Sequence, residues 1–318
     1  MGYGIGGYIS LSKQTAFGTA TTNRVFIPFV SESLTENIEQ LQSENLKNIY
    51  DAPNDLAGIN NTTGDIVFEP HPIYMGHFLN GCLGDATTTF TSSAANHEFL
   101  PRQNEFASNC TLRPYTVEIF KNVGSAYQVT DALIHTLAIE ITAGAIIRAT
   151  ATLHGRAYGK VAKQTPSFIE ADPFTWNETS VQIAGSANGE LESATITIEN
   201  PIEGIPTLNG SVNEGKLLRS DFRNITVSGD QDFSSQAEEA KFRAQTRQRF
   251  LFTITGDDIG GSKNNEMTFD LPSVNYQTYA YPIGGPGRIT AAYEGKAEYD
   301  TSSSYALRVT MQNTQTSY

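Results

Sequence analysis

The chain opens on glycines whose spacing could hold a phosphate group. The stretch GYGIGG places Gly2, Gly4 and Gly7 in a G-x-G-x-x-G pattern, which in dinucleotide-binding proteins cradles a pyrophosphate. That chemistry needs a strand before the loop and a helix whose N-terminus receives the phosphate. Here no strand is seen before Gly2, and the β-like stretch YISLSK follows. We interpret the stretch as a flexible glycine-rich arm and predict no bound cofactor.

Residues that could ligate a metal are present, but not in the spacing of known sites. The chain has five histidines, at His71, His77, His97, His135 and His154. They fall outside the close spacings of structural zinc sites, and the two cysteines form no C-x-x-C pair. Residues 257–266, DDIGGSKNNE, mix carboxylates and glycine but lack the alternating ligands of a calcium loop. We predict no metal site and interpret this stretch as a polar hairpin loop.

Catalytic nucleophiles are not signalled either. No G-x-S-x-G elbow occurs, and scattered Ser, His and Asp residues do not define a triad, which is recognised by its geometry. We therefore predict no catalytic residues and a protein that is not an enzyme.

Composition argues against a protein that adheres to nucleic acid. The 318 residues carry a formal net charge of −13, and only 17% are charged. Proteins that bind nucleic acid without regard to sequence neutralise phosphates with clustered Lys and Arg. The densest cationic stretch, residues 241–249, is interrupted by uncharged residues and is interpreted as a solvated helix face. Acidity still permits DNA to pass close by without binding.

The sequence indicates neither export nor membrane insertion. The N-terminal residues lack a cationic start followed by an apolar run, and no stretch of 18 apolar residues occurs. We expect a protein made in a cytosol that remains soluble. Cys82 and Cys110 are then interpreted as two small buried residues and not as a disulfide.

A repeat sets the organisation of the chain. RATATLHGRA at 148–157 is echoed by RITAAYEGKA at 288–297. Three further pairs keep the same order: ESLTENIEQ at 32–40 with ESATITIEN at 192–200, DIVFE at 65–69 with NITVS at 224–228, and YTVEIF at 115–120 with FLFTIT at 250–255. Because the matches are collinear, we predict an internal duplication.

Each half is predicted to contain one helix. In the first half, apolar residues from Tyr74 to Leu83 form a broad face that ends at Gly84. In the second half, Ser235 and Glu238 could form a capping box ahead of a stripe at Ala237, Ala240 and Ala244.

These elements predict a mainly β chain of tandem β-sandwich domains with one helix each, because a parallel α/β sheet would need a helix after nearly every strand. We place the first domain at 1–165, with its N-terminal arm, and the second at 166–318, with the join near the prolines of residues 163–173. Gly155 and Gly295 are predicted to occupy equivalent bend or bulge positions.

The N-terminal motifs resemble a known family. The segments GGYISLSKQTAFGTA, VFIPFVSESLTENIE and GDIVFEPHPIYMGHFLNGCLG are similar to the glycine arm, Lys-x-Thr-x-x-Gly-Thr segment, Ser-Glu strand and Gly-x-Ile-x-Phe strand of the major tail tube proteins of long, flexible-tailed bacteriophages. The resemblance covers the first half directly and the second half through the repeat.

The resemblance implies a structural virion protein whose β-sandwich subunits form stacked rings around a channel for genome delivery into the host. Related tubes use six sandwich domains per ring, so a duplicated chain implies a homotrimeric ring. It also implies assembly in the host cytoplasm, partnership with tape measure, tail terminator and distal tail proteins, and DNA that passes without specific binding. Head-to-tail contacts between copies generate such rings.

An acidic channel wall would let DNA slide, whereas a basic wall would hold it. The candidate lumen-facing carboxylates lie on the paired strands of both halves: Glu32, Glu36, Glu39, Asp65, Glu69, Glu192 and Glu199.

Two long polar segments, 41–63 and 201–222, separate the paired strands, and loops of this length are usually functional or disordered. We expect them to reach the neighbouring ring, and we expect deletion of 45–60 to leave a soluble subunit that does not polymerise. The candidate inter-ring residues are Glu44, Asn45, Lys47, Asn48, Asp51 and Asp55.

Two other functions stay open from the sequence. One is a different self-assembling component of a virion or secretion tube, and the other is a β-sandwich carbohydrate-binding module. Self-assembly of the purified chain separates the first from the second.

Overall fold

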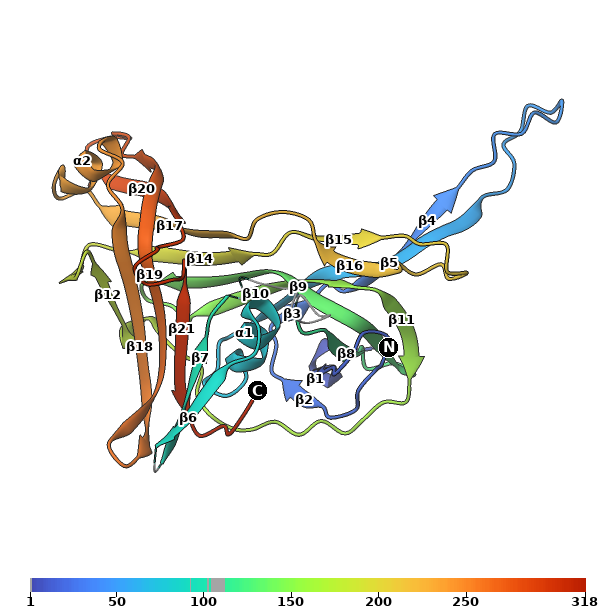
Figure 1. Ribbon diagram of the computed structural model, residues 1–318, viewed down its shortest axis with the longest axis horizontal. Helices are drawn as coiled ribbons and strands as arrows, with labels where there is room; N and C mark the ends of the chain where they lie inside the picture. The colour runs from blue at the N-terminus through green and yellow to red at the C-terminus, as the bar shows by residue number, and fades with distance from the viewer. Residues whose placement is uncertain (1, 92, 102, 104–111) are drawn as a thin grey trace.

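The computed structural model describes residues 2–91, 93–101, 103 and 112–318. Strands dominate this part of the chain, and the ladders between its named strands are antiparallel (Figure 1). The prediction of a mainly β fold is thereby confirmed. Cys82 is buried, as expected, whereas Cys110 lies outside the described residues.

The first half of the chain forms two sheets that share one long strand, β9 (Ala126–Thr142). One sheet runs in the order β2 (Val25–Ile27), β1 (Tyr8–Lys13), β8 (Tyr115–Phe120), the start of β9, and β11 (Ala157–Val161). The other runs in the order β3 (Ser31–Glu32) with β4 (Thr35–Leu41), β5 (Leu56–Phe68), β10 (Arg148–Gly155), and the end of β9.

The strand β9 changes sheet at Asp131. Residues 126–130 pair with β11, and residues from Leu133 onward pair with β10. Between them Asp131 has a φ of 59°, a left-handed conformation that is uncommon for residues other than glycine. One continuous strand therefore supplies both layers of this half.

The second half repeats the pairing order around the long strand β19 (Lys263–Ala280). One sheet contains β13 (Ser186–Ala187), β12 (Thr179–Ile183), β18 (Gln248–Gly260), the start of β19, and β21 (Arg308–Asn313). The other contains β14 (Ser193–Glu199), β17 (Asn224–Asp232), β20 (Thr290–Ala297), and the end of β19.

The two halves are joined by shared ladders. The end of β9 pairs with β14, so that the sheet containing β5 continues into the sheet containing β17. The hairpin of β6 (Thr87–Thr91) and β7 (Ala94–Phe99) comes from the first half but extends the second-half sheet, because β7 pairs with β21. A single large core cluster accordingly contains side chains from both halves, from Ile9 to Met311.

Both predicted helices are present, but the capping box predicted for the second is not. The helix α1 (Met75–Leu83) is buried along its whole length and ends at Gly84. The helix α2 (Ala237–Arg243) has no side-chain cap, so the proposed box of Ser235 and Glu238 is wrong. Glu238 of α2 accepts a hydrogen bond from Tyr276 of β19 at 2.9 Å, and the partly buried Phe242 packs against the core.

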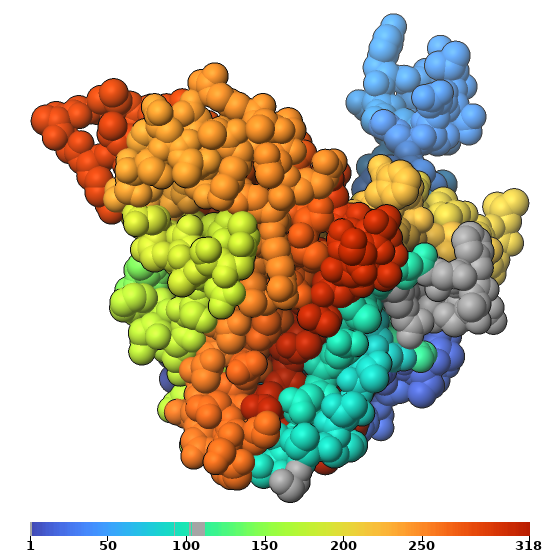
Figure 2. Space-filling model, turned by 60° about the vertical axis from the view of Figure 1, so that its left-hand side comes forward, coloured from blue at the N-terminus to red at the C-terminus, as the bar shows by residue number. Residues whose placement is uncertain are grey.

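Both long segments contain strands where irregular chain was expected. Residues 56–63 belong to β5, and the segment 201–222 contains a hairpin of β15 (Ile202–Ile205) and β16 (Lys216–Arg219). Figures 1 and 2 both show the tip of the β4–β5 hairpin standing clear of the rest of the molecule. No helix in the described part of the chain is long and apolar enough to cross a membrane.

Candidate assembly surface

One face of the continuous sheet forms a broad polar surface. Along β5, β10, β9, β14, β17 and β20, alternate side chains such as Ile66, Ile139 and Ile196 enter the core, so the intervening ones share the opposite face. We call this opposite face the threonine face. Its hydroxyl residues are Thr63, Thr136, Thr142, Thr150, Thr152, Ser193, Thr195, Thr197, Thr226, Ser228 and Thr290.

The threonine face carries more acidic than basic residues. Two of its carboxylates, Asp65 and Glu199, were among the predicted lumen-facing residues, and Thr152 donates a 2.6 Å hydrogen bond to Asp65. Glu69 follows the end of β5 and lines a pocket with Val30 and His71. Strand alternation adds the carboxylates Glu140, Asp230 and Glu294 and the cations Arg148 and Lys296. These residues were missed because a face emerges only once the strands are placed in register.

The other predicted lumen residues have different positions. Glu32 and Glu36 lie two residues either side of the buried Leu34, so strand alternation places them on the same side of the chain as Leu34 and not on the threonine face. Glu32 forms an ion pair with Lys121 at 3.0 Å. Glu39 lies at a register shift between β4 and β5, where it accepts a hydrogen bond from the Ile59 amide. Glu192 forms an ion pair with Arg288 at 2.5 Å. The seven carboxylates therefore do not share one face.

The ladder between β9 and β14, which we call the internal seam, joins the two halves edge to edge. Seven residue pairs run from Ser193 opposite Thr142 to Glu199 opposite Thr136. On its core side Ile139 lies opposite Ile196, and both are fully buried. The seam combines backbone hydrogen bonds with apolar cross-strand pairs, which together stabilise an antiparallel ladder.

Two strand edges lie at the ends of this sheet. Among the described residues, β3 and β4 pair with β5 on one side only. At the opposite end, residues 275–280 of β19 pair with β20 and with no other strand in the described part of the chain. Unpaired edges present rows of backbone donors and acceptors that invite another strand.

The tip of the β4–β5 hairpin, residues 42–55, forms a projecting arm (Figure 2). All six predicted inter-ring residues lie on this arm and are exposed, and Asn48 is left-handed with a φ of 54°. Leu46, Ile49 and Tyr50 are exposed beside them. An apolar tip on an arm with few contacts to its own molecule is typical of a binding element.

The second hairpin, β15–β16, is held against the first half by its loop. The buried Glu214 contacts His154 Nε2 at 2.7 Å and accepts a hydrogen bond from Asn61 at 3.0 Å. Burial raises the pKa of Glu214, but the hydrogen bonds from His154 and Asn61 outweigh it and hold that pKa below its usual value. A small apolar cluster includes Ile202 of β15 and Leu133 of β9, which lies opposite His154.

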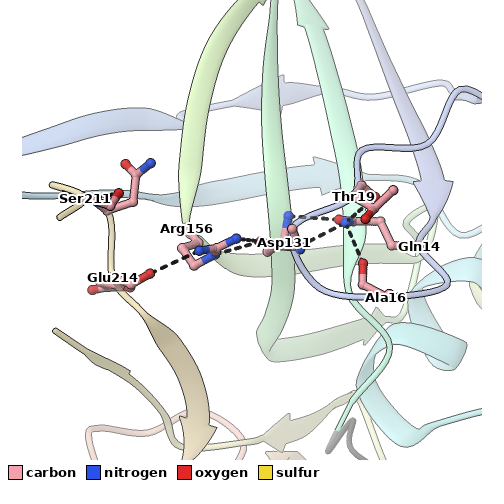
Figure 3. A network of polar contacts seen from close by, with 9 residues as sticks. Gln14, Ala16, Thr19, Asp131, Arg156, Ser211 and Glu214 are labelled. Carbon is pink, nitrogen blue, oxygen red and sulfur yellow. Dashed lines mark hydrogen bonds and ion pairs between the residues drawn. The ribbon is translucent and has the colours of Figure 1, made fainter. Parts of the chain in front are cut away.

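A polar network fixes the N-terminal segment to the bend of β9 (Figure 3). The buried Asp131 carboxylate accepts hydrogen bonds from Gln14 at 3.0 Å, from the Gly18 amide at 2.7 Å and from Arg156 at 2.7 Å. Gln14 in turn donates to the Thr19 carbonyl at 2.8 Å. The Lys-x-Thr-x-x-Gly-Thr segment is thus a loop that closes over Asp131.

In the described part of the chain, neither the candidate metal ligands nor the glycine arm has the geometry of the site that it suggested. Within the described ranges, no three His, Cys, Asp or Glu side chains gather in a way that could hold a metal ion. The glycine arm forms a short 3-10 turn at Gly4–Gly6 and runs into β1, with no helix after it to receive a phosphate.

The fold and its edges define a class: a mainly β, antiparallel-sheet protein with strand edges suited to association. The family model described as phage tail tube protein matches residues 4–297, nearly the whole chain, and the chain belongs to this family. A search of curated proteins found no match. The assignment to phage tail tube proteins is thereby confirmed, and the chain is a structural tail tube protein, a virion component of a family whose members assemble into tubes.

Proposed function

We propose that the chain is a tandem duplication whose copies form three-chain rings, and that stacked rings make the tube of a long, flexible phage tail. The genome passes through the channel into the host. This proposal adds the duplication, the stoichiometry, the tail type and the conduit to the family assignment.

The internal seam carries the proposal. In the first half, β3 and β4 form one edge of the sheet and the end of β9 forms the other. In the second half, β14 and the end of β19 form the corresponding edges. The seam pairs the β9 edge of the first half with the β14 edge of the second half. The same junction between copies would join the β19 edge of one chain to the β3–β4 edge of the next.

A repeated set of contacts supports the duplication. The Asp65 amide donates to the Ser33 hydroxyl at 2.9 Å, and the Asp230 amide donates to the Ser193 hydroxyl at 3.0 Å. A glycine precedes each aspartate, and a Cβ at Gly64 or Gly229 would strike the backbone of the serine's strand. Ser33 and Ser193 are also matched in the repeat of 32–40 with 192–200.

The threonine face is the proposed channel wall. Short hydroxyl side chains make a smooth polar surface, and the excess of carboxylates over Arg148 and Lys296 repels DNA phosphates. Asp65, Glu140, Glu199, Asp230 and Glu294 are the proposed lumen carboxylates.

Electron cryo-microscopy of tubes assembled from the purified chain tests the ring. We expect three chains per ring, with pseudo-sixfold walls and the threonine face toward the channel. Six chains per ring would overturn the stoichiometry, and a threonine face buried between rings would overturn the channel assignment. A chain that stays monomeric at high concentration would overturn assembly and favour the binding-module alternative.

The projecting arm is proposed to contact the neighbouring ring. Because β5 begins at Leu56 and Asn60 and Asn61 hold the β15–β16 hairpin, the informative deletion is shorter than 45–60. Replacing residues 43–54 by a Gly-Ser linker is expected to leave folded subunits that form rings but no tubes. A linker variant that makes tubes of normal length would contradict this role.

A further inference from the structure

At the internal seam, the β9–β10 turn of the first half seats against the chain entering the second half. The Ala143 amide donates to the Glu192 carbonyl at 2.9 Å, and the Trp176 amide donates to the Ala145 carbonyl at 3.2 Å. Ile146 also bridges to Thr175. We call residues 143–147 the seated turn.

The seated turn lies beside an apolar groove of about 600 Å³. Ile141 and Ala143 line it from the first half, and Trp176, Val181 and Leu191 line it from the second. The groove is thus shared across the seam, with the 3-10 turn Trp176–Glu178 and the start of β14 as its second-half wall.

The first half has a groove in the corresponding place. A 3-10 turn, Gly4–Gly6, precedes β1 as Trp176–Glu178 precedes β12. With the start of β3 it borders a groove of about 720 Å³, lined by Ile5, Val30 and Glu32 among others. Glu32 matches Glu192 in the repeat. We call this the N-terminal groove; the described residues place no counterpart of the seated turn against it.

The counterpart of the seated turn lies at the far edge of the molecule. The residues TAGAIIRAT, 142–150, align with PIGGPGRIT, 282–290, in continuation of the echo at 148–157. The β19–β20 turn, residues 282–288, is exposed throughout, and Ile283 has 77% of its surface exposed. It adjoins the free edge of β19.

We propose that, in the ring, the β19–β20 turn of one copy seats in the N-terminal groove of the next copy. Ile283 occupies the place that Ala143 holds at the internal seam, against Ile5 and Val30. The backbone of Glu32 and of the glycine arm supplies the hydrogen bonds. This inference rests on the proposed ring and assigns its contact to one turn and one groove.

Exposure and backbone chemistry agree with this partner. Ile5 is fully exposed in the isolated subunit, and Val30 and Ile283 are at least half exposed; seating the turn removes all three from water, which is favourable in proportion to the apolar area buried. Gly284, Gly285 and Gly287 face Gly4 and Gly6 across the junction, so the two backbones can approach closely.

A cysteine pair tests the contact directly. In a Cys110→Ser background, with the buried Cys82 retained, Ile5→Cys and Ile283→Cys are combined and assembled tubes are oxidised. We expect covalent species of two and three chains on non-reducing gels, and at least a tenfold lower yield from either single variant or from the control pair Ile5→Cys with Phe90→Cys, which uses an exposed residue of β6.

The outcomes separate this contact from ring formation itself. Normal tubes that give no cross-link between positions 5 and 283 would overturn the seating of the turn and leave the proposed function standing. Wild-type chain that forms no rings would overturn the proposed function, and the seating with it.

A charge in place of Ile283 gives a second test. Ile283→Asp is expected to raise the concentration needed for ring formation about tenfold or more, because the carboxylate would be buried without a partner. The circular dichroism of the subunit is expected to stay that of wild type, since residue 283 is exposed there. Phe90→Asp is the matched control, and an unchanged assembly threshold for Ile283→Asp would contradict the inference.

Discussion

Gly155 and Gly295 carry the same packing constraint in the two halves. A Cβ on Gly155 would strike a methyl of Val129, and a Cβ on Gly295 would strike a methyl of Val274. Both valines belong to the long strands β9 and β19, and a register shift interrupts each of the two ladders nearby. A valine packed over the strand explains why each position has no side chain.

Gly155→Ala is therefore expected to destabilise the chain by about 1–3 kcal/mol, the usual cost of overpacking a core. Urea denaturation of the subunit measures it. Gly159→Ala in β11 is the control, since a Cβ there meets nothing within 4 Å, and it is expected to be near neutral. Combining Gly155→Ala with Val129→Ala is expected to relieve the clash; an unrelieved double variant would show that the valine is not the obstacle.

The stability of the fold should also respond to a buried histidine in α1. Burial, together with the nearby charge of Lys13, lowers the pKa of His77 to about 4 from 6.5. Because the folded pKa is depressed, the folded state favours the neutral imidazole. The free energy of unfolding is therefore highest above pH 6.5 and decreases as the pH falls toward 4. The loss amounts to about 3 kcal/mol, at 1.36 kcal/mol per unit of pKa difference.

The comparison that isolates this group is wild type against His77→Phe, in urea titrations at pH 7.5 and pH 5. The variant is expected to lose less stability between the two pH values than wild type does. His135→Asn, at a half-buried histidine on β9, serves as the control. An equal pH dependence in wild type and His77→Phe would rule out His77 as the source.

At the scale of elements, the β15–β16 hairpin depends on one carboxylate from its own loop. Glu214 fills the space beside Gly204 and bonds His154 and Asn61 of the first half. Glu214→Ala removes these contacts and leaves His154 and Asn61 without this partner. Losing buried hydrogen bonds to a charged group is expected to cost about 2–3 kcal/mol.

Limited proteolysis reads this change locally. We expect cleavage within residues 206–215 to become at least tenfold faster in Glu214→Ala, while cleavage of the arm at residues 42–55 stays at the wild-type rate. Glu203→Ala is the control, because this residue lies on the same hairpin and is exposed. Hairpin cleavage at the wild-type rate in Glu214→Ala would contradict the anchoring role.

Local patterns predicted some elements well and others poorly. The apolar periodicity of 74–83 located α1 because that helix is held by its own buried face. The stripe of alanines predicted the wrong buried face of α2, since Ala237 and Ala240 are exposed. Glu238 and Glu239 instead accept hydrogen bonds from tyrosine hydroxyls. Propensity and patterning do not report contacts of that kind.

Local patterns also gave the wrong register for one pair of strands in the repeat. DIVFE was matched with NITVS, but the hydrogen-bond partners of Asp65 correspond to those of Asp230, six residues further along the second half than that match implies. The pattern Gly-Asp-x-x-Phe at 64–68 and 229–233 was the available signal. Alternation alone could not fix the register, because a strand of period two matches itself at every second residue.

The whole molecule is more tightly joined than a division at residue 165 suggests. The core cluster runs through both halves, β14 completes the sheet of β9, and β7 of the first half completes the sheet of β21. The polar network of Gln14, Asp131 and Arg156 and the threonine face likewise arise from residues far apart in sequence, which no local pattern brings together.

We therefore expect one cooperative thermal transition for the subunit. Its calorimetric and van't Hoff enthalpies should agree, as for a two-state domain. The fragments 1–165 and 166–318 made separately are expected to be insoluble or unfolded, and to recover structure when refolded together. Two resolved transitions in the intact chain, or a stably folded fragment, would count against a shared core.

The internal seam also affects the rate at which assembly of a tube nucleates. Its two strands are tethered through residues 143–192, so they meet at a local concentration of about millimolar, set by the linker and independent of how dilute the protein is. In the proposed three-chain ring, half of the junctions would then be made while each chain folds, and only the junctions between chains would need a collision. Nucleation of the proposed ring should accordingly follow a lower power of protein concentration than it would for the same halves on separate chains, so that assembly would begin at a lower concentration of subunit.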